Sequence, residues 1–219
     1  MNFTASEENY IKSIYHLQQE TNTVNTNSLA AEMQTRPASV TDMLKKLQTK
    51  KLLQYEKYKG FKLNESGKKI ALGVVRKHRL WEFFLANKLG IEWDKVHAIA
   101  EELEHINSTE LIQRLDNFLG YPSFDPHGDP IPDKNGKIPL LKQLNLSTAP
   151  VTRTLTVSSV TNQTPQMLEM LKHYHISIGT QLKVIRQFEF DHSIEIKVLK
   201  KTSCILSEQV AKNVFVHYE

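Results

Sequence analysis

The chain has 219 residues, of which 40% are hydrophobic and 24% charged, and its net charge is +4. No run of about 18 apolar residues occurs, and the N-terminus lacks a basic lead followed by an apolar block, so we expect a globular, cytoplasmic protein that is neither secreted nor membrane-spanning. The single cysteine, Cys204, excludes an internal disulfide and a thiolate zinc cluster built from one chain. A bound metal would therefore use oxygen and nitrogen ligands.

The charge is unevenly distributed along the chain. Residues 1–80 hold 14 Lys and Arg against 7 Asp and Glu, residues 81–150 hold 6 against 11, and residues 151–219 hold 8 against 6. A basic first third is suited to a polyanion, and an acidic middle third is suited to a cation.

The first 50 residues predict three helices. Apolar residues recur at helical spacing over residues 6–19, and Ser6 is the expected N-cap. A short second helix is expected from Ser28, and Pro37 is suited to the first position of a longer third helix. This order of a short helix, a tight turn and a longer helix is that of a helix-turn-helix.

A hairpin and a long helix are expected next. Alternating apolar residues from Leu53 to Leu63, around the sequence KYKG, predict a two-stranded hairpin, which in this position is a wing. A cap signal in NESGKK then begins a helix at about residues 65–89. Its large apolar side chains exceed one stripe, which indicates burial against a second subunit.

The second half of the chain changes character. An acidic helix over residues 97–105 and a helix in STELIQRLDNFLG are followed by YPSFDPHGDPIPDKNGKIP, whose prolines predict a linker or extended loop at a domain boundary. From about Val151, alternating runs with one helical piece, PQMLEMLKHY, predict a small β domain, most simply a five-stranded barrel.

Imidazole and carboxylate groups are concentrated in two helical segments. The stretch HAIAEELEH places four of them on one helical face, and the long helix before it offers an i, i+4 pair. Two such helices can close a site for a divalent cation, and Mn²⁺ and Fe²⁺ accept mixed Glu, Asp and His ligands. The candidate ligands are His97, Glu101, Glu104 and His105 on the acidic helix, and His78 and Glu82 on the long helix.

Two other classes of function are compatible with these residues. Glu102 and His105 form one Glu-x-x-His unit of the kind that carboxylate-bridged di-metal oxidoreductases use twice, but no second unit occurs in the helical region. A winged-helix adaptor that binds protein and no metal is the other alternative.

The segments VRKHRLWEFFL and KVHAIAEELEHINS, behind a winged helix-turn-helix and ahead of FDPHGDPIP, resemble the DtxR/MntR family of metal-dependent transcriptional repressors. The resemblance covers essentially the whole chain. It implies a mainly α N-terminal two-thirds and a small C-terminal SH3-like β-barrel, in a homodimer with two metal sites per subunit. The implied domains are a winged helix-turn-helix DNA-binding domain at 1–70, a helical metal-binding and dimerisation domain at 71–145, and an SH3-like β domain at 150–219.

The resemblance also implies the ligands of a primary metal site. Glu101, Glu104 and His105 match the manganese-type members, and Glu101 stands where iron-type members carry cysteine. Asn9 falls where the family has an aspartate ligand, and Lys12 falls where some short members have a glutamate.

An ancillary site is implied as well, with two alternatives that stay open. His78 and Glu82 would be joined either by His97 or by a pair from the DPHGDP loop, in which an aspartate replaces a cysteine. The alternative loop ligands are Asp125 and His127, and a further ligand from the barrel is expected near Asn162 or Gln163.

The N-terminal end of the third helix is the end that a recognition helix presents to base edges. Lysines near the hairpin tip would contact phosphates without reading sequence. The candidate DNA-binding residues are Arg36, Pro37, Ala38, Ser39, Thr41, Asp42, Lys45 and Lys46 on the helix, and Lys57, Lys59 and Lys62 at the wing.

The predicted function is that of a repressor of metal-uptake genes that binds double-stranded operator DNA as a homodimer when Mn²⁺, or alternatively Fe²⁺, is bound. In the mechanism that we predict, the metal links the first helix, through Asn9, to the acidic helix and so fixes the spacing of the recognition helices.

Overall fold

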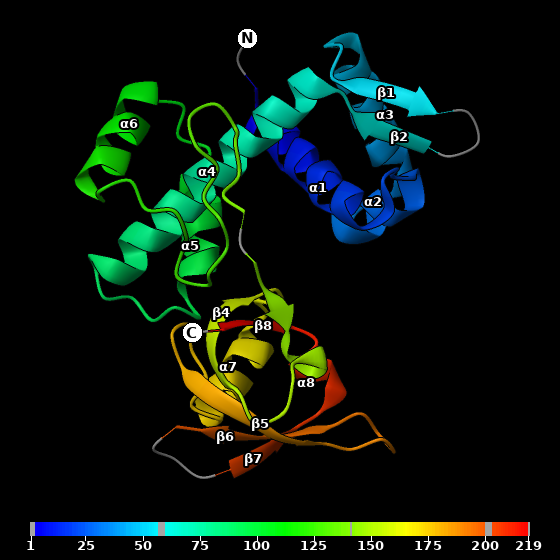
Figure 1. Cartoon of the computed structure of the whole chain (residues 1–219). Helices are drawn as coiled ribbons and strands as arrows, with labels where there is room; N and C mark the ends of the chain where they lie inside the picture. The colour runs from blue at the N-terminus through cyan, green and yellow to red at the C-terminus, as the bar shows by residue number, and fades with distance from the viewer. Residues whose placement is uncertain (1–2, 57–59, 141, 200–202, 219) are drawn as a thin grey trace. The chain divides into compact units, whose positions relative to one another are not determined.

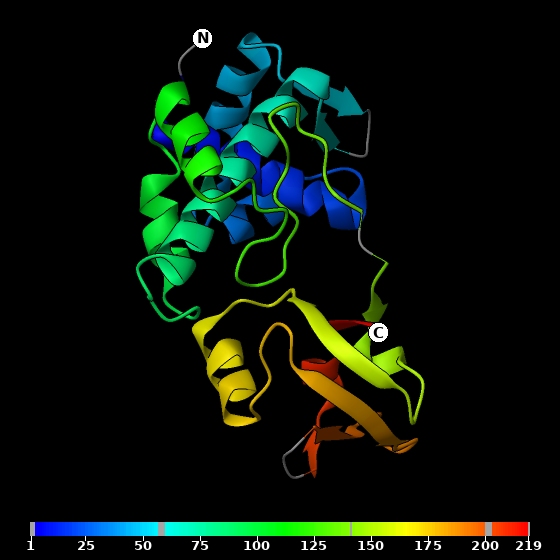
Figure 2. The same cartoon turned by 60° about the vertical axis from the view of Figure 1, so that its left-hand side comes forward.

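A computed structural model describes residues 3–56, 60–140, 142–199 and 203–218 (Figures 1 and 2). The chain divides into two compact units, which are described separately below. The first unit contains residues 1–78, 101–113 and 132–138, and the second contains residues 79–100, 114–131 and 139–219.

The first unit contains the predicted helix-turn-helix and wing, drawn from blue to cyan in Figure 1. The strands of the wing are antiparallel and pair Leu53 with Leu63. The apolar faces of the three helices and the hairpin form one core around Ile11, Ile14 and Leu47, all fully buried. The elements are α1 (Ala5–Thr21), α2 (Thr26–Glu32), α3 (Pro37–Thr49), β1 (Leu53–Glu56) and β2 (Gly60–Leu63).

The start of α1 differs from the prediction, because Thr4 and not Ser6 is the N-cap. Thr4 Oγ1 accepts a hydrogen bond from Glu7 N, and the Glu7 carboxylate accepts one from Thr4 N. This reciprocal pair is a capping box, which satisfies two amides that a helix start leaves without intrahelical partners. By contrast, Pro37 occupies the start of α3 as predicted.

Three further helices follow the wing: α4 (Glu65–Asn87), α5 (Val96–Leu103) and α6 (Thr109–Phe118). The residues of α4 up to His78 belong to the first unit, and those from Arg79 on belong to the second. The acidic helix is shorter than predicted. It ends at Leu103, so Glu104 and His105 lie in the following turn and do not continue the helical face.

The proline-rich segment is irregular, as predicted, but its first part is not a solvated linker. Asp125, His127 and Ile131 are buried. Gly128 has a φ of +82°, and a Cβ there would lie 1.8 Å from the carbonyl oxygen of Ser158. His127 O also accepts a hydrogen bond from Val160 N. The loop is therefore packed directly on a strand of the C-terminal domain, within the second unit.

The C-terminal part of the second unit is a small SH3-like antiparallel β domain. Its described residues form a sheet of six strands in the order β3-β8-β4-β5-β6-β7, so the prediction of five strands was wrong. The helix α7 packs Met167, Leu168 and Leu171 into the core beside the sheet (Figure 2). The elements are β3 (Leu144–Asn145), the 3-10 turn η1 (Leu146–Thr148), β4 (Thr154–Val160), α7 (Pro165–His173), β5 (Gln181–Gln187), β6 (Ile194–Val198), β7 (Ser203–Leu206), α8 (Glu208–Ala211) and β8 (Val214–Tyr218).

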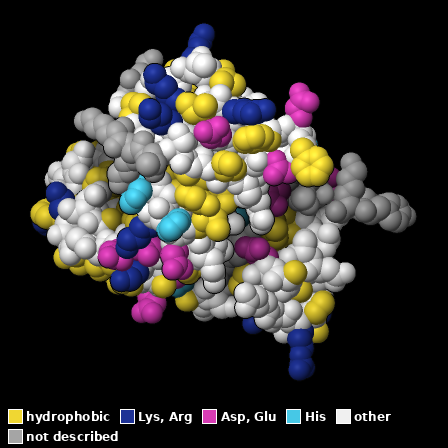
Figure 3. Space-filling model, turned by 90° about the horizontal axis from the view of Figure 1, so that it is seen from below, with side chains coloured by type: hydrophobic (Ala, Val, Ile, Leu, Met, Phe, Trp, Pro, Cys, Tyr) yellow, Lys and Arg dark blue, Asp and Glu magenta, His cyan; other side chains and the backbone are white. Residues whose placement is uncertain are grey.

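Two surface properties bear on function. In the described part of the chain, no helix combines the length and apolar character needed to cross a bilayer. On the face shown in Figure 3, Lys and Arg side chains are scattered among acidic and hydrophobic ones. The described side chains on that face therefore form no continuous basic surface.

Candidate metal and DNA-binding sites

Ionisable side chains connect α1 with the end of α5 inside the first unit. The ammonium group of Lys12 lies at their centre, since Lys12 Nζ is 2.7 Å from Glu101 Oε1 and 2.6 Å from Glu104 Oε1. His78 Nδ1 is 2.7 Å from the other oxygen of Glu104. We term this group the Lys12 cluster, and it consists of Glu8, Lys12, His78, Glu101, Glu104 and His105.

Glu104 is the fully buried member of this cluster. Burial alone would raise the pKa of its carboxyl group, but the hydrogen bond with His78 and the charge of Lys12 outweigh burial and lower that pKa. Glu104 therefore remains a carboxylate in the interior, with Lys12 as its counter-charge.

Hydrogen bonding fixes the orientation of the His105 ring. Its Nδ1 lies 2.7 Å from Glu8 Oε2, and with Nδ1 as the donor its Nε2 carries the free lone pair. Nε2 is buried, makes no hydrogen bond and lies 3.7 Å from Glu104 Oε1. A histidine whose far nitrogen is held by a carboxylate is the usual arrangement of a metal ligand.

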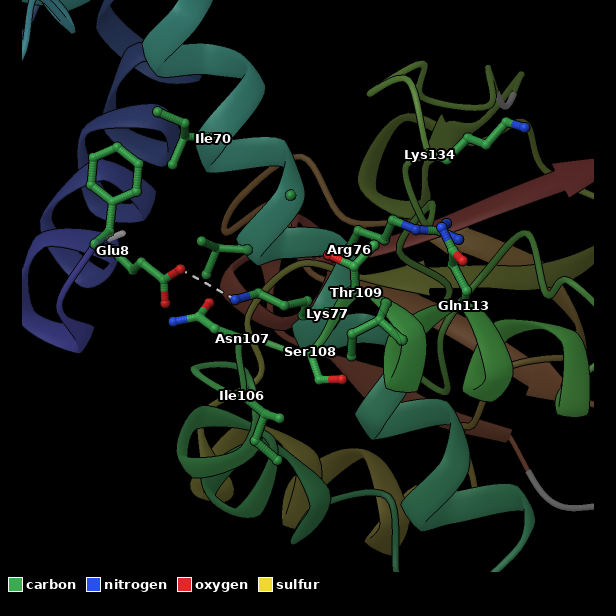
Figure 4. A pocket seen from close by; sticks show the side chains of 14 residues that line it. Glu8, Ile70, Arg76, Lys77, Ile106, Asn107, Ser108, Thr109, Gln113 and Lys134 are labelled. Carbon is green, nitrogen blue, oxygen red and sulfur yellow. Dashed lines mark hydrogen bonds and ion pairs between the residues drawn. The ribbon is translucent and has the colours of Figure 1, made fainter. Parts of the chain in front are cut away.

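Glu8 thus holds the His105 ring in its orientation. It also forms an ion pair with Lys77 at 3.2 Å, at the edge of a cavity of about 450 Å³ that Asn107 and Ile106 also line (Figure 4). Through Glu8, the edge of the Lys12 cluster reaches this cavity.

The primary-site residues predicted from the sequence meet in this cluster, except that Asn9 is adjacent to it in α1. The side-chain oxygen of Asn9 is buried and has no hydrogen-bond partner. Asn9 Oδ1 and His105 Nε2 are thus two buried polar atoms without hydrogen-bond partners. Burying such atoms costs folding free energy, and a cation that bound both of them would offset this cost. The donors of this site therefore fit a divalent metal.

A second group lies within the second unit, where α4 meets the proline-rich loop. We term Glu82, Asp125 and His127 the loop cluster. All three are buried, and each offers a ligand atom within 4.8 Å of the others. Two carboxylates and one imidazole are suited to Mn²⁺ or Fe²⁺.

A hydrogen bond also orients the His127 ring, but here Nε2 makes the hydrogen bond, whereas in His105 it is Nδ1. His127 Nε2 is 2.8 Å from the carbonyl oxygen of Trp93, so Nε2 is the donor and Nδ1 keeps its lone pair. Nδ1 is buried without a hydrogen bond, and its distance of 3.8 Å to Glu82 Oε1 is too long for one.

Asp125 is held by its own loop. One of its oxygens accepts hydrogen bonds from the amides of His127 and Asp129 at 2.8 and 2.9 Å. The other oxygen is buried with no hydrogen-bond partner and lies 3.6 Å from Arg79 Nε. The glycine-containing loop therefore presents this second oxygen as an acceptor that makes an ion pair with Arg79 but no hydrogen bond.

The pKa values show that negative charge and burial dominate this cluster, although Arg79 lies 3.6 Å from Asp125. Burial, together with the nearby carboxylates of Asp129 and Glu82, raises the pKa of Asp125 to about 8. Burial lowers the pKa of His127, but Glu82 and Asp125 outweigh burial and raise it. The carboxylates thus raise the pKa of both groups, and a cluster of buried carboxylates with one imidazole fits a divalent metal.

The two alternatives for the ancillary site are placed differently. His97 Nδ1 is 3.1 Å from Glu82 Oε1, but the side chain of His97 is 46% exposed, whereas Asp125 and His127 are buried. The structure thus brings both His97 and the loop pair to Glu82, with only the loop pair buried beside it, and it places His78 in the Lys12 cluster. Asn162 Oδ1 caps its own turn, and Gln163 Nε2 donates to Asp129 Oδ2 at 2.9 Å.

The candidate DNA-binding residues of α3 form an exposed row. Lys45 pairs with Asp42 at 3.2 Å, and Thr41 Oγ1 donates to Pro37 O within the helix. Lys62 pairs with Glu56 in the wing, whereas Lys57 and Lys59 lie outside the described residues. The exposed residues are Arg36, Pro37, Ala38, Ser39, Thr41, Asp42, Lys45 and Lys46.

A winged helix-turn-helix accompanied by clusters of carboxylate and imidazole groups is typical of metal-responsive DNA-binding proteins. Residues 2–61 match the family described as the iron dependent repressor N-terminal DNA binding domain. Residues 64–133 match the iron dependent repressor metal binding and dimerisation domain, and residues 144–218 match the FeoA domain.

Individual relatives agree with these matches. The chain is 36% identical over 118 residues to the HTH-type transcriptional regulator MntR of Bacillus subtilis, covering 54% of this chain and 82% of that protein. It is 33% identical over 125 residues to the iron-dependent repressor IdeR of Mycobacterium bovis, covering 57% of this chain. The matched part spans 54%, or about half, of the length of IdeR.

Solved structures extend the similarity to nearly the whole chain. A manganese-dependent transcriptional repressor in complex with manganese has a TM-score of 0.87 and 33% identity, covering 97% of this chain and 100% of that one. ScaR with bound Cd²⁺ has a TM-score of 0.82 and 31% identity, covering 97% and 99%. The chain belongs to the DtxR/MntR family of metal-dependent transcriptional repressors.

Proposed function

We propose that this protein represses metal-uptake genes by binding operator DNA in the cytoplasm, as a homodimer, when Mn²⁺ or alternatively Fe²⁺ is bound. The observation that carries the proposal is the Lys12 cluster. Two residues of α1, Glu8 and Lys12, are bonded to three residues at the end of α5 and in the turn after it. Because α1 packs in the core of the DNA-binding domain, an event in this cluster acts directly on that domain.

In the proposal, Asn9, Glu101, Glu104 and His105 hold the primary metal, and Glu82, Asp125 and His127 hold the ancillary one. A bound cation would supply the positive charge that joins these donors. Glu8 and the Trp93 carbonyl orient the two imidazoles so that each turns a lone pair toward its site.

Dimer formation is supported by apolar surface at the end of α6 and just after it. Phe118 and Tyr121 are 65% and 66% exposed, which is unusual for two large aromatic side chains three residues apart. The match to a dimerisation domain covers these residues. A twofold dimer would present two recognition helices to successive major grooves, about one DNA turn apart.

The alternative as a di-metal oxidoreductase is disfavoured by the position of Glu102. This residue would belong to the Glu-x-x-His unit, but its side chain is exposed on α5 and lies outside both clusters. Regulation, in contrast, uses the residues that the structure does bring together.

The test is a titration of metal into a DNA-binding assay with the promoter beside the protein's own gene. Mn²⁺ or Fe²⁺ should raise DNA affinity at least about tenfold, which corresponds to a coupling of about 1.4 kcal/mol. An affinity that does not depend on metal would contradict the proposal and favour the adaptor.

A control variant separates DNA contact from metal binding. Replacing Lys45 and Lys46 together by alanine should weaken binding to all sequences and reduce the salt dependence by about two phosphate contacts, with metal affinity unchanged. Ser39→Ala should act mainly on sequence preference. Equal losses on specific and random DNA for both variants would count against these roles.

A further inference from the structure

The Lys12 cluster contains a cation that is part of the chain. Lys12 Nζ contacts both oxygens of Glu104, at 2.6 and 2.8 Å, and one oxygen of Glu101 at 2.7 Å. The two glutamates are proposed ligands of the primary site, and the ammonium group occupies the space on which their oxygens converge.

We propose that Lys12 is a built-in competitor of the metal: its ammonium group occupies the primary site in the metal-free protein, must leave when metal binds, and so sets the metal concentration that activates the repressor. This inference rests on the proposed function, because it concerns the regulation of the same site.

Burial makes the competition effective. The Lys12 side chain is only 12% exposed and that of Glu104 is 0% exposed, so this ion pair is little screened by water or salt. Lys12 is also tethered to α1, which gives its ammonium group a high effective concentration at the site. A cation from solution must therefore displace a partner that is always present.

Steric and electrostatic effects act in the same direction. The three short contacts leave Glu104 and the facing oxygen of Glu101 already bonded, so a metal that uses both carboxylates needs the space that Nζ fills. A positive charge retained nearby would also repel a dication. Asn9 Oδ1 and His105 Nε2, which are buried without hydrogen bonds, are left unused while Lys12 is in place.

The competition also gives the metal-free protein its own link between α1 and the turn after α5. Lys12 bonds to Glu104 across 92 residues of sequence. Removing its charge should therefore destabilise the metal-free form and strengthen metal binding. These opposite effects distinguish a competitor from a residue that only supports the fold, whose loss would weaken both.

The experiment compares the full-length parent with Lys12→Met, which keeps the length and apolar stem of the side chain but removes its charge. Metal affinity is measured by calorimetric titration of Mn²⁺, and stability by thermal unfolding with and without Mn²⁺. If the ammonium group occupies the site about 90% of the time, its removal should tighten the Mn²⁺ dissociation constant about tenfold. The melting temperature should fall without metal, and its rise on adding Mn²⁺ should be larger than in the parent.

Two variants serve as controls. Lys50→Met removes another lysine that is ion-paired to α1, at 2.6 Å from Glu7, and should lower stability without changing Mn²⁺ affinity. Lys12→Arg keeps the charge and should bind Mn²⁺ as weakly as the parent or more weakly. If Lys12→Met does not fold, Lys12→Arg tests the proposal in its place. A Mn²⁺ affinity of Lys12→Arg that is tighter than that of the parent would overturn the proposal.

Chemical labelling gives a readout in the unmodified protein. Acetylation of Lys12, followed by mass spectrometry, should accelerate when Mn²⁺ is added, whereas acetylation of Lys50 should not. Unchanged labelling, or an unchanged or weaker Mn²⁺ affinity in Lys12→Met, would show that Lys12 remains in place beside the metal and would overturn the inference. If the parent does not bind Mn²⁺ or Fe²⁺ at all, the proposed function fails instead.

Discussion

The Lys12 cluster and the loop cluster have similar donors but differ in how closely a basic side chain contacts them. In the first, Glu104 is fully buried with an ammonium group against both of its oxygens. In the second, Asp125 keeps a buried oxygen without a hydrogen bond, and its pKa is raised to about 8 by burial and by Asp129 and Glu82. Arg79 lies 3.6 Å from that oxygen and makes no hydrogen bond with it, whereas Lys12 is bonded to both oxygens of Glu104. In our proposal, a metal can therefore enter the loop cluster without displacing a hydrogen-bonded cation, but must displace Lys12 from the other cluster.

The two clusters also differ in how the backbone builds them. Members of the Lys12 cluster come from α1, α4, the end of α5 and the turn after it, so their positions depend on helix packing. The ligands from the proline-rich loop depend on a tight turn at Gly128 against β4. Substitution of a side chain in the Lys12 cluster should therefore disrupt that cluster. The loop cluster should be disrupted by a substitution that alters the backbone of its loop.

The largest effect is expected from Glu104→Gln. This change keeps the shape of the side chain but removes the charge that Lys12 and the proposed metal share. At least about 100-fold more Mn²⁺ should be needed for half-maximal DNA binding, and the metal-free protein should lose about 3 kcal/mol of unfolding free energy because Lys12 keeps only Glu101. DNA binding against free Mn²⁺ and urea unfolding measure the two effects.

Glu102→Gln is the matched control, since Glu102 is exposed on α5 two residues earlier. It should change neither quantity. A Glu104→Gln protein that responds to Mn²⁺ like the parent would show that the primary site is assigned to the wrong residues.

Gly128→Ala should break the loop cluster alone. A Cβ here meets the Ser158 carbonyl oxygen at 1.8 Å, and the φ of +82° is unfavourable for alanine. We expect a loss of about 2–4 kcal/mol of unfolding free energy and of one class of bound metal, with the Lys12 cluster still able to bind. Gly90→Ala, at a φ of +68° with open space around it, should cost about 1 kcal/mol. Equal losses for the two variants would show that the contact with β4 is unimportant.

Asp125→Cys should alter which metal the loop cluster prefers. A thiolate is a softer donor than a carboxylate, so affinity for Zn²⁺ and Cd²⁺ should rise about tenfold relative to Mn²⁺. Competition titrations between Mn²⁺ and Zn²⁺ measure the ratio. Asp133→Cys, on an exposed part of the same segment, is the control. A ratio that changes equally in both variants would mean that Asp125 is not a ligand.

Much of the fold was predictable from local pattern. The helices α1 to α7, the wing and four of the six strands of the C-terminal sheet follow apolar periodicity and signals such as Pro37. The capping box from Thr4 to Glu7 is also present in the sequence, but Ser6, two residues later, is an equally common type of N-cap. The missed elements are short: β3 has two residues, and β7 and α8 have four each. Elements of two to four residues are too short to show the alternation of a strand or the periodicity of a helix.

The candidate sites were less predictable, because their geometry depends on contacts between distant segments. No glycine or proline marks the end of α5 at Leu103, so Glu104 and His105 were assigned to a continuous helix. In the sequence, Lys12 stands out only as a departure from the family pattern. Its contacts with Glu101 and Glu104 cross 89 and 92 residues, and no local rule predicts them.

The smallest effect is expected at Asn9, where the family pattern has an aspartate. The buried Oδ1 of Asn9 has no hydrogen-bond partner, which is consistent with a ligand position beside the Lys12 cluster. Asn9→Asp adds one negative charge. This charge attracts the ammonium group of Lys12 as well as a metal, but a dication interacts about twice as strongly as a monocation at the same distance, so the metal should gain more.

The net result should be a shift of the Mn²⁺ concentration for half-maximal DNA binding to a value about three- to tenfold lower. Asn22→Asp makes the same change of charge at the exposed far end of α1 and should leave that midpoint where it is. If Asn9→Asp also leaves the midpoint unchanged, Asn9 is not a ligand, and helix α1 responds to metal through the contact between Glu8 and His105. In that case Glu8→Gln, which weakens the hold on the His105 ring, should raise the midpoint.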